Sequence, residues 1–531
     1  MNHPSLITLE RDSAPRTLFS GDRLVEVDLP AGTRCIYPKQ PIEPLRDPDA
    51  AIRYALNHPI DSEPLYARLR PGMKVTIAVD DISLPLPPMR RPDVRQRLVT
   101  IVLELLAEHG VEDVEIVIAT GVHRRMKPDE VRHMLGDKIF DAYWPDRLYN
   151  HDAEDTDNLV VVGKTDHGEV LELNRRAAES DLLIYANLNF VPMNGGYKSV
   201  AVGLCSYKSL RPHHNPQAIR SSDSYMDPKG SQLARDIERM GRLAHKELPI
   251  FTIETTVNNR MFDRSLDFLM KNEDELSGRE RALLKGLVLT TARLPQAARH
   301  AIFDRFPAPY GMTGVWAGEV GAVHQKTVEK NFEQYCVPIE GQADVLVFGV
   351  PYISPYNVHA FLNPLLVQVL AQGYLFNMYR GAPLVKKGGT LILLHPCTDK
   401  FDHEQHAPYV DFVHRLLPET RDAVELRARY EEKYARDPAL IQMYRTGHAY
   451  HPSHPFFMWY WGENGRQHLG RVIVVGADNE YIPKLFGWET APSMEDALYR
   501  AKGGEARSLD VTLLHVPPIV MGDLSRSGGK G

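Results

Sequence analysis

A lysine and a histidine pair follow a glycine pair in the stretch NGGYKSVAVGLCSYKSLRPHH, which runs from Asn194 to His214. The amine of Lys198 can bond covalently to a bound group, and an imidazole sixteen residues later can bind a metal ion. Taken alone, a lysine after two glycines is usually a solvated turn residue, and a histidine pair is usually a surface feature. The rest of the sequence has to separate the two interpretations.

Three polar loops follow apolar runs in the same half of the chain. They are DDISLPLPP after Val79, GVHRRM after Thr120, and the asparagine-rich loop after DLLIYANL. In open parallel sheets, ligands bind beyond the carboxyl ends of the strands. We therefore expect these loops to converge at one rim, facing the segment PYISPYNVH (351–359) from the second half of the chain.

Apolar runs alternate with amphipathic segments along the chain, which is typical of an α/β protein. The runs 75–79 and 114–120 predict buried strands, and the apolar spacing between Asp93 and His109 predicts a helix that Gly110 ends. The fold class expected is α/β, with two Rossmann-like parallel-sheet domains and a helical insertion between them.

The strand-like runs also suggest where the domains divide. ADVLVFGVP, GGTLILLHP and GRVIVVGAD mark a second α/β block, and LDVTLLHVP precedes the tail SRSGGKG. We expect an N-terminal α/β domain over 1–257, a helical insertion over 258–311, a C-terminal α/β domain over 312–495, and a C-terminal strand with a disordered tail over 496–531.

The bulk composition is that of a globular chain with two domains. It has 531 residues, 43% of them hydrophobic and 25% charged, and a net charge of -7, which gives no reason to expect nucleic acid or an anionic membrane as a partner. No apolar run approaches the roughly 18 residues of a membrane span. The four scattered cysteines form no C-x-x-C pair, which argues against a zinc ribbon and fits reduced thiols in the cytoplasm.

The segments DDISLPLP, ATGVHRRM, NHDAEDTDNL and GGYKSVAVGLCSYKSLRPHH, in this order and spacing, resemble the nickel-pincer-nucleotide-dependent lactate racemase family. The resemblance runs from Leu29 to Asn258 and resumes more weakly at VWAGEVGAVHQ and ADVLVFGVP. It implies a cytoplasmic isomerase whose N-terminal domain binds a nickel-pincer nucleotide, a pyridinium mononucleotide that holds nickel through two sulfur arms and a carbon. It also implies cofactor-maturation enzymes and a small hydroxy acid as partners.

The resemblance assigns roles by position. Lys198 matches the covalent anchor of the cofactor, and His214 matches the nickel ligand, with His213 as the alternative. A tridentate pincer in a planar nickel(II) field leaves one corner for a neutral imidazole. Gly195 and Gly196 are expected to let the backbone approach the cofactor, because they carry no Cβ.

The proton chemistry is assigned in the same way. His123 matches the family's acid/base histidine, which takes the proton from a substrate hydroxyl while the carbon-bound hydrogen leaves as hydride to the cofactor. Asp81 and Ser83 match positions that line the cofactor and the site.

The departures from the family lie on the substrate side. Leu84 stands where the family has an arginine, and the loop before the glycine pair lacks the family's second acid/base histidine. A loose alignment puts His359 and Asn363 at the family's substrate-facing tyrosine and lysine. Because asparagine cannot imitate the two-point fork of arginine, we expect a polyhydroxylated, sugar-acid-like 2-hydroxy acid rather than lactate. The asparagines expected to bind its hydroxyls are Asn187, Asn189, Asn357 and Asn363.

The second acid/base stays open at this point. His359 is the first choice, but the substrate could also pivot and use His123 twice. The chain could alternatively be a sugar redox isomerase or oxidoreductase, or a non-catalytic carrier of the cofactor, against which the retained His123 argues. An ordinary nucleotide- or sugar-phosphate-binding enzyme is a further alternative, weakened by the absence of a P-loop or G-x-G-x-x-G signature.

Two further segments carry residues of interest. HPSHP (451–455) is interpreted as a surface feature, and DHEQH (402–406) as a loop outside the site. Trp459 and Trp461 either form a wall of the cofactor site or pack in an aromatic core.

Overall fold

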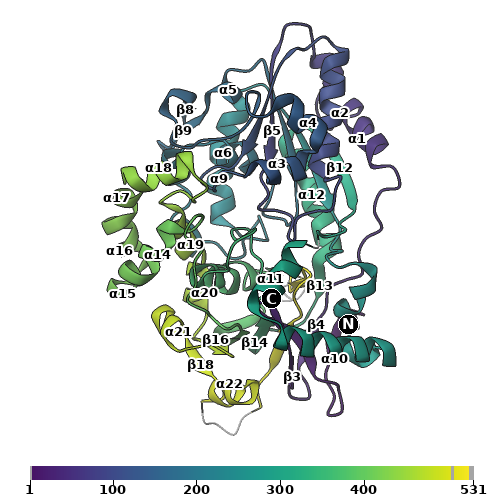
Figure 1. The fold of residues 1–531 in the computed structure, drawn as a ribbon, viewed down its shortest axis with the longest axis vertical. Coiled ribbons are helices and arrows are strands. Elements are labelled where there is room, and N and C mark those ends of the chain that lie inside the picture. The colour runs from purple at the N-terminus through teal and green to yellow at the C-terminus, as the bar shows by residue number, and fades with distance from the viewer. Residues whose placement is uncertain (1–2, 306, 504–507, 526–531) are drawn as a thin grey trace.

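The structure is a computed structural model that describes residues 3–305, 307–503 and 508–525. Its described part contains two mainly parallel sheets, which lie at opposite ends of the long axis in Figure 1, with helices around and between them. The predicted α/β class, with two parallel-sheet regions and a helical insertion, is therefore confirmed. The tail that we expected to be disordered includes residues 526–531, which lie outside the described residues.

The first sheet carries the strands after which the predicted site loops begin. It is parallel except at one edge, where the strand that comes last in the chain pairs antiparallel with its neighbour. Its strands, in spatial order, are β12 (Met312–Gly318), β11 (Ile250–Val257), β10 (Leu182–Leu188), β5 (Lys74–Asp80), β6 (Asp113–Ala119) and β7 (Leu148–Asn150). Strand β10 is buried along its whole length, as expected of a strand covered on both faces.

The helix predicted between the first two strands is α2 (Val94–Glu108), which contacts β5 and β10. The carboxylate of Asp93 caps it by accepting a hydrogen bond from the backbone N–H of Arg95. Helix α12 (Val320–Tyr335) packs on β11 and β12 at the other edge of the sheet.

The second sheet joins segments from both ends of the chain. Its strands, in spatial order, are β1 (Leu6–Thr8), β4 (Arg34–Ile36), β19 (Val511–Leu514), β14 (Ala343–Gly349), β16 (Val385–Leu394), β17 (Arg471–Val475) and β18 (Glu489–Ala491). Strands β1 and β4 come from the range 1–257, and β12 of the first sheet from the range 312–495, so the sheets exchange strands across those ranges. The domain boundaries themselves stay a prediction.

The insertion is helical, as expected. Its elements are η3 (Arg264–Met270), η4 (Glu273–Glu275), α10 (Gly278–Arg293) and α11 (Gln296–Arg305). It packs on the hairpin of β2 (Arg16–Ser20) and β3 (Arg23–Val27), which α10 contacts. Arg16 is fully buried and donates to Asp274 at 2.7 Å, which fixes the insertion to the hairpin.

Helix α19 (His454–Trp461) lies between the two sheet regions (Figure 1). All of its residues are buried, as expected of a helix that is hydrophobic all round. Among the described helices, none combines the length and apolarity that a bilayer crossing requires.

Candidate active site

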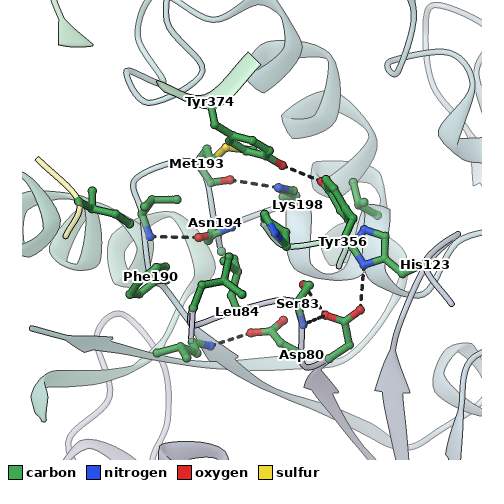
Figure 2. Close-up of a pocket in the computed structure, with 18 of the residues that line it drawn as sticks. Asp80, Ser83, Leu84, His123, Phe190, Met193, Asn194, Lys198, Tyr356 and Tyr374 are labelled. Atoms are coloured by element: carbon green, nitrogen blue, oxygen red, sulfur yellow. Dashed lines mark hydrogen bonds and ion pairs between the residues drawn. The ribbon is translucent and has the colours of Figure 1, made fainter. Parts of the chain in front are cut away.

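Loops from both sheets meet at one cavity of about 240 Å³. Asp81, His123 and Asn187 reach it from the carboxyl ends of β5, β6 and β10, while Pro351 and Val516 reach it from those of β14 and β19. Figure 2 shows part of this lining. The convergence expected from the carboxyl-end rule is therefore found, with the cavity between the two sheets.

His123 is held by the loop that follows β5. Its Nδ1 lies 2.8 Å from Oδ2 of Asp81, and the other oxygen of Asp81 accepts hydrogen bonds from the backbone and hydroxyl of Ser83 (Figure 2). Burial acts to raise the pKa of Asp81, but His123 and the Ser83 donors outweigh it and hold that pKa below its ordinary value. A carboxylate here favours the tautomer with hydrogen on Nδ1, so Nε2 of His123 is the nitrogen free to exchange a proton with a ligand.

Two buried arginines fix the loops that carry this pair. Arg95 binds both oxygens of Asp93 and donates to the carbonyl oxygen of Asp81. Arg124, next to His123, donates to both carboxylate oxygens of Glu130 at 2.6 and 2.8 Å. Paired forks of this kind restrict loop motion, so His123 and Asp81 are held in place before any ligand binds.

Lys198 lies at the start of the short helix α6 (Lys198–Gly203) and lines the cavity. Its Nζ has one described hydrogen bond, to the carbonyl oxygen of Met193 at 3.4 Å (Figure 2). Burial lowers the pKa of Lys198 to about 8, although Asp80 and Asp81 act in the opposite direction. A larger share of this amine is therefore neutral, which is the nucleophilic form.

His214 lines the cavity and His213 does not, which separates the two neighbours. Their Nδ1 atoms lie 2.7 Å apart, and the ring of His214 stacks on Trp461 at 5.5 Å between centroids. Burial, together with His213 and Lys198, holds the pKa of His214 well below its ordinary value. The ring is thus neutral, as a metal-binding imidazole must be. Among the described residues, no three His, Cys, Asp or Glu side chains cluster so as to hold a metal by themselves.

The backbone of the glycine pair adopts a conformation that packing within the protein requires. Gly195 and Gly196 both have positive φ, at +80° and +61°. An added Cβ at Gly195 would lie 2.7 Å from Oε1 of Glu254, and one at Gly196 would lie 2.7 Å from the ring of His324. The backbone N–H of Gly196 also donates to Glu254. The glycines therefore allow a tight turn against the protein's own side chains, and Gly195 alone of the pair lines the cavity.

The predicted substrate asparagines mostly serve the protein itself. Asn187 lines the cavity, but in its better amide orientation it donates to both oxygens of Asp80. Asn189 donates to Thr327 at 2.6 Å and does not line the cavity. Asn363 caps α13 (Pro364–Gln368), again outside the lining.

Two other expected residues also lie outside the cavity lining. Asn357 accepts a hydrogen bond from the backbone of Ser354 at 2.6 Å. His359 is exposed, with φ of +58°, and its charge acts on Glu130. The structure thus places His359 outside the cavity that His123 lines.

Several lining residues were not predicted. Asp80 accepts hydrogen bonds from Tyr185 and from the backbone of Leu188, and burial raises its pKa to about 7. The hydroxyl oxygens of Tyr356 and Tyr374 are hydrogen-bonded to each other at 2.6 Å. Figure 2 shows this pair above Lys198.

The interpretation of HPSHP as a surface feature was wrong. His451 and His454 are buried, and His454 lines the cavity. Of the two tryptophans, Trp461 lines the cavity and Trp459 packs outside it. The run HPFFMWYW, which is mostly apolar and aromatic after its first residue, was the signal that could have identified this segment as interior.

Most of the remaining lining is hydrocarbon. The apolar lining residues include Leu84, Leu86, Phe190, Met193, Met261, Ile353 and Ile519. Among the described lining residues the basic side chains are Lys198 and the histidines His123, His214 and His454, and no arginine is present.

Comparisons with known proteins agree with the geometry. Residues 20–227 match the family described as lactate racemase N-terminal domain. The lactate racemase of Thermoanaerobacterium thermosaccharolyticum is 25% identical over 174 residues, which are 32% of this chain and 39% of that protein. The lactate racemase of Lactiplantibacillus plantarum is 27% identical over 176 residues, with the same shares covered. The aligned part thus spans about two fifths of these relatives' length.

The likeness in fold extends further than the likeness in sequence. The solved structure of the Thermoanaerobacterium thermosaccharolyticum lactate racemase apoprotein superposes with a TM-score of 0.62 and 18% identity, covering 96% of this chain and all of that one. At this identity the match shows the fold alone. Asp81, His123, Lys198 and His214 fall within the matched domain, whereas α19 and its histidine lie beyond it.

Proposed function

Because residues 20–227 of this chain match the lactate racemase N-terminal domain family, we propose that the protein is a racemase or epimerase of 2-hydroxy acids. The observation that carries the proposal is the convergence of an anchor amine, a neutral imidazole and a carboxylate-bound histidine on one cavity. Lys198, His214 and the Asp81–His123 pair supply these groups. Each of these three groups has one task in the proposed reaction.

The described residues fit the anchor and the metal ligand of a nickel-pincer nucleotide. Lys198 would hold it covalently through its buried amine, and His214 would complete the coordination of nickel. When bound, this cofactor supplies reversible acceptance of the carbon-bound hydrogen as hydride. Cofactor-maturation enzymes are then transient partners of this chain.

The chain's own residues handle the hydroxyl proton. Nε2 of His123 takes it from the substrate, and the carboxylate of Asp81 stabilises the imidazolium that forms. The hydroxyl proton returns to the substrate oxygen when the carbon is restored with the opposite configuration. Tyr356, Tyr374 and the aromatic side chains of α19 exclude water from this exchange.

The cavity supports a larger and more apolar substrate than lactate. The sugar-acid expectation depended on free asparagine groups at the cavity, but Asn189, Asn357 and Asn363 lie outside its lining, and Asn187 donates to Asp80 in its better amide orientation. Leu84, Phe190 and Met193 instead present hydrocarbon to the same cavity that Lys198 lines (Figure 2). Burying an apolar substituent there contributes about 25 cal/mol per Å², whereas buried hydroxyls without partners are costly. We therefore propose a 2-hydroxy acid with an apolar side chain.

The test is to produce the protein together with the cofactor-making enzymes. Intact mass should show an adduct on Lys198, and metal analysis should find nickel in equal amount. Chiral chromatography should then show interconversion of 2-hydroxyisocaproate or 3-phenyllactate at least tenfold faster than of lactate or gluconate. Gluconate as the best substrate would restore the sugar-acid expectation. An adduct with no turnover of any enantiomer would instead indicate a cofactor carrier.

A further inference from the structure

A second histidine, His454, lies beside His123 on the wall of the cavity. It is 1% exposed and begins helix α19. Its ring centroid lies 5.5 Å from that of His123, and the two rings are nearly perpendicular, at 84°. The two imidazoles reach the same cavity from different halves of the chain. His123 follows β6 in the first half, and His454 begins α19 in the second.

The two nitrogens of His454 have different environments. Nδ1 is hydrogen-bonded to the hydroxyl of Tyr409. Nε2 is buried and has no hydrogen-bond partner among the described residues. Leaving a buried polar atom unpaired costs about 1–3 kcal/mol, so such an atom in a ligand cavity indicates a partner that arrives with the ligand.

The surroundings keep this ring neutral and fixed. Burial, followed by His123, His406 and His451, holds the pKa of His454 well below its ordinary value. The rings of Tyr356 and Tyr450 pack against it at 4.9 and 4.5 Å between centroids. A neutral imidazole with one nitrogen tied to a hydroxyl can take a proton on the other, since a tyrosine hydroxyl either donates to Nδ1 or accepts from it.

We propose that His454 is the second acid/base of this site, an inference that rests on the proposed racemase function. Nε2 of His454 takes the hydroxyl proton of one enantiomer, and Nε2 of His123 takes that of the other. In each case the O–H bond breaks as an N–H bond forms on one ring, and the other ring, protonated beforehand, gives its proton to the oxygen when the carbon is restored. Proton exchange with solvent then resets the two rings for the next turnover. The carbon-bound hydrogen follows the route given above, so the substrate is isomerised with no net gain or loss of atoms or electrons.

The distance between the rings suits this division of work. Inversion presents the two faces of one carbon to a fixed anchor, so the hydroxyl of each enantiomer takes a different position. Rings 5.5 Å apart can each serve one of two oxygen positions within a single small substrate. His359 cannot share this task from its exposed position.

The test compares His454→Gln with His123→Gln in cofactor-loaded protein, with exposed His403→Asn as the matched control. Enantiomers have equal free energy, so loss of either base lowers steady-state kcat/KM equally in both directions. The informative step is the first half of a single turnover, measured as ketone trapped by acid quench from each pure enantiomer of 3-phenyllactate or 2-hydroxyisocaproate.

We expect His454→Gln to slow ketone formation from one enantiomer by at least about 100-fold and from the other by less than about threefold. His123→Gln should show the opposite preference. Tyr409→Phe should slow the same enantiomer as His454→Gln, by a smaller factor, and it keeps the test decisive if His454→Gln does not fold. Nickel content of each variant should equal that of wild type, which separates a loss of base from a loss of cofactor.

The outcomes separate this inference from the proposed function. If wild type fails to interconvert every probe, the proposed function is overturned. If wild type interconverts them while His454→Gln slows both enantiomers equally, or neither, the role of His454 alone is overturned.

Discussion

Asp81 and His123 form a carboxylate–imidazole pair in which Oδ2 lies 2.8 Å from Nδ1, and further contacts hold the pair in place. Ser83 occupies the second carboxylate oxygen, and Arg95 binds the carbonyl oxygen of the same aspartate. The pair therefore sets the tautomer of His123 as well as its orientation. The structure therefore gives Asp81 a role in orienting His123, and Asp81 also lines the cavity.

Replacing Asp81 with Asn should lower kcat by about 100-fold or more, because the amide no longer favours the tautomer with a free Nε2 on His123. The side-chain volume is retained, so near-ultraviolet circular dichroism should stay unchanged. Ser83→Ala is the matched control and should cost less than tenfold. Equal losses in the two variants would show that the aspartate acts only through loop structure.

The amine of Lys198 should react with amine-directed reagents at lower pH than an ordinary lysine. Because burial lowers its pKa to about 8, the neutral fraction rises as pH increases through 8, and so should the rate of labelling. Peptide mapping by mass spectrometry between pH 6 and pH 10 measures this rate for the apoprotein. A half-maximal rate above pH 10 would contradict the prediction, and Lys198→Met identifies the labelled peptide.

His214→Ala should abolish nickel retention while leaving the covalent adduct on Lys198, because the ring supplies the chain's own ligand. His213→Ala is the natural comparison, since its ring touches His214 but does not reach the cavity. We expect it to keep at least half of the nickel. Metal analysis and intact mass on the same samples give both quantities, and the reverse order of nickel contents would move the ligand role to His213.

Leu84→Arg should change substrate choice rather than fold. Leu84 is half-buried on the cavity wall, where a guanidinium can reach the substrate carboxylate. We expect kcat/KM for 2-hydroxyisocaproate to fall at least tenfold and that for lactate to rise. Leu84→Met conserves volume and should change the ratio by less than threefold. A ratio that Leu84→Arg leaves unaltered would place the substrate elsewhere in the cavity.

Gly195→Ala should destabilise the protein by about 2 kcal/mol or more, because φ is +80° and the new Cβ would meet Glu254. Gly286→Ala, on an exposed turn of α10 where a Cβ meets nothing within 4 Å, should instead stabilise by about 0.5–1 kcal/mol. Thermal unfolding of both apoproteins measures the contrast. Similar midpoints for the two variants would show that the glycine turn can relax.

The parts of the fold that follow from local pattern were predictable. The β5–α2–β6 unit emerges from apolar runs, helical spacing and the caps at Asp93 and Gly110. The convergence of the loops after β5, β6 and β10 followed from the carboxyl-end rule for parallel sheets, whereas Lys198, His214 and His123 were identified through the resemblance to a known family. The strand, helix and loop inferences needed only neighbouring residues or the known behaviour of parallel sheets.

Long-range packing was not predictable from the sequence. His454 reaches His123 across 331 positions of sequence, and nothing local marks that approach. The asparagines were assigned by chemical type, but a side-chain amide serves a helix cap or a buried carboxylate as readily as a ligand. Only coordinates separate these uses, because hydrogen-bond partners come from distant elements.

Strand β19 lies between β4 and β14, although it is the last of the three to be synthesised. On the ribosome, the first sheet has all of its strands by residue 318, whereas the second lacks an interior strand until residues 511–514 emerge. The loop after β19 also lines the cavity. Any enzyme that loads the cofactor must therefore either wait for a finished chain or work on one whose pocket still lacks a wall.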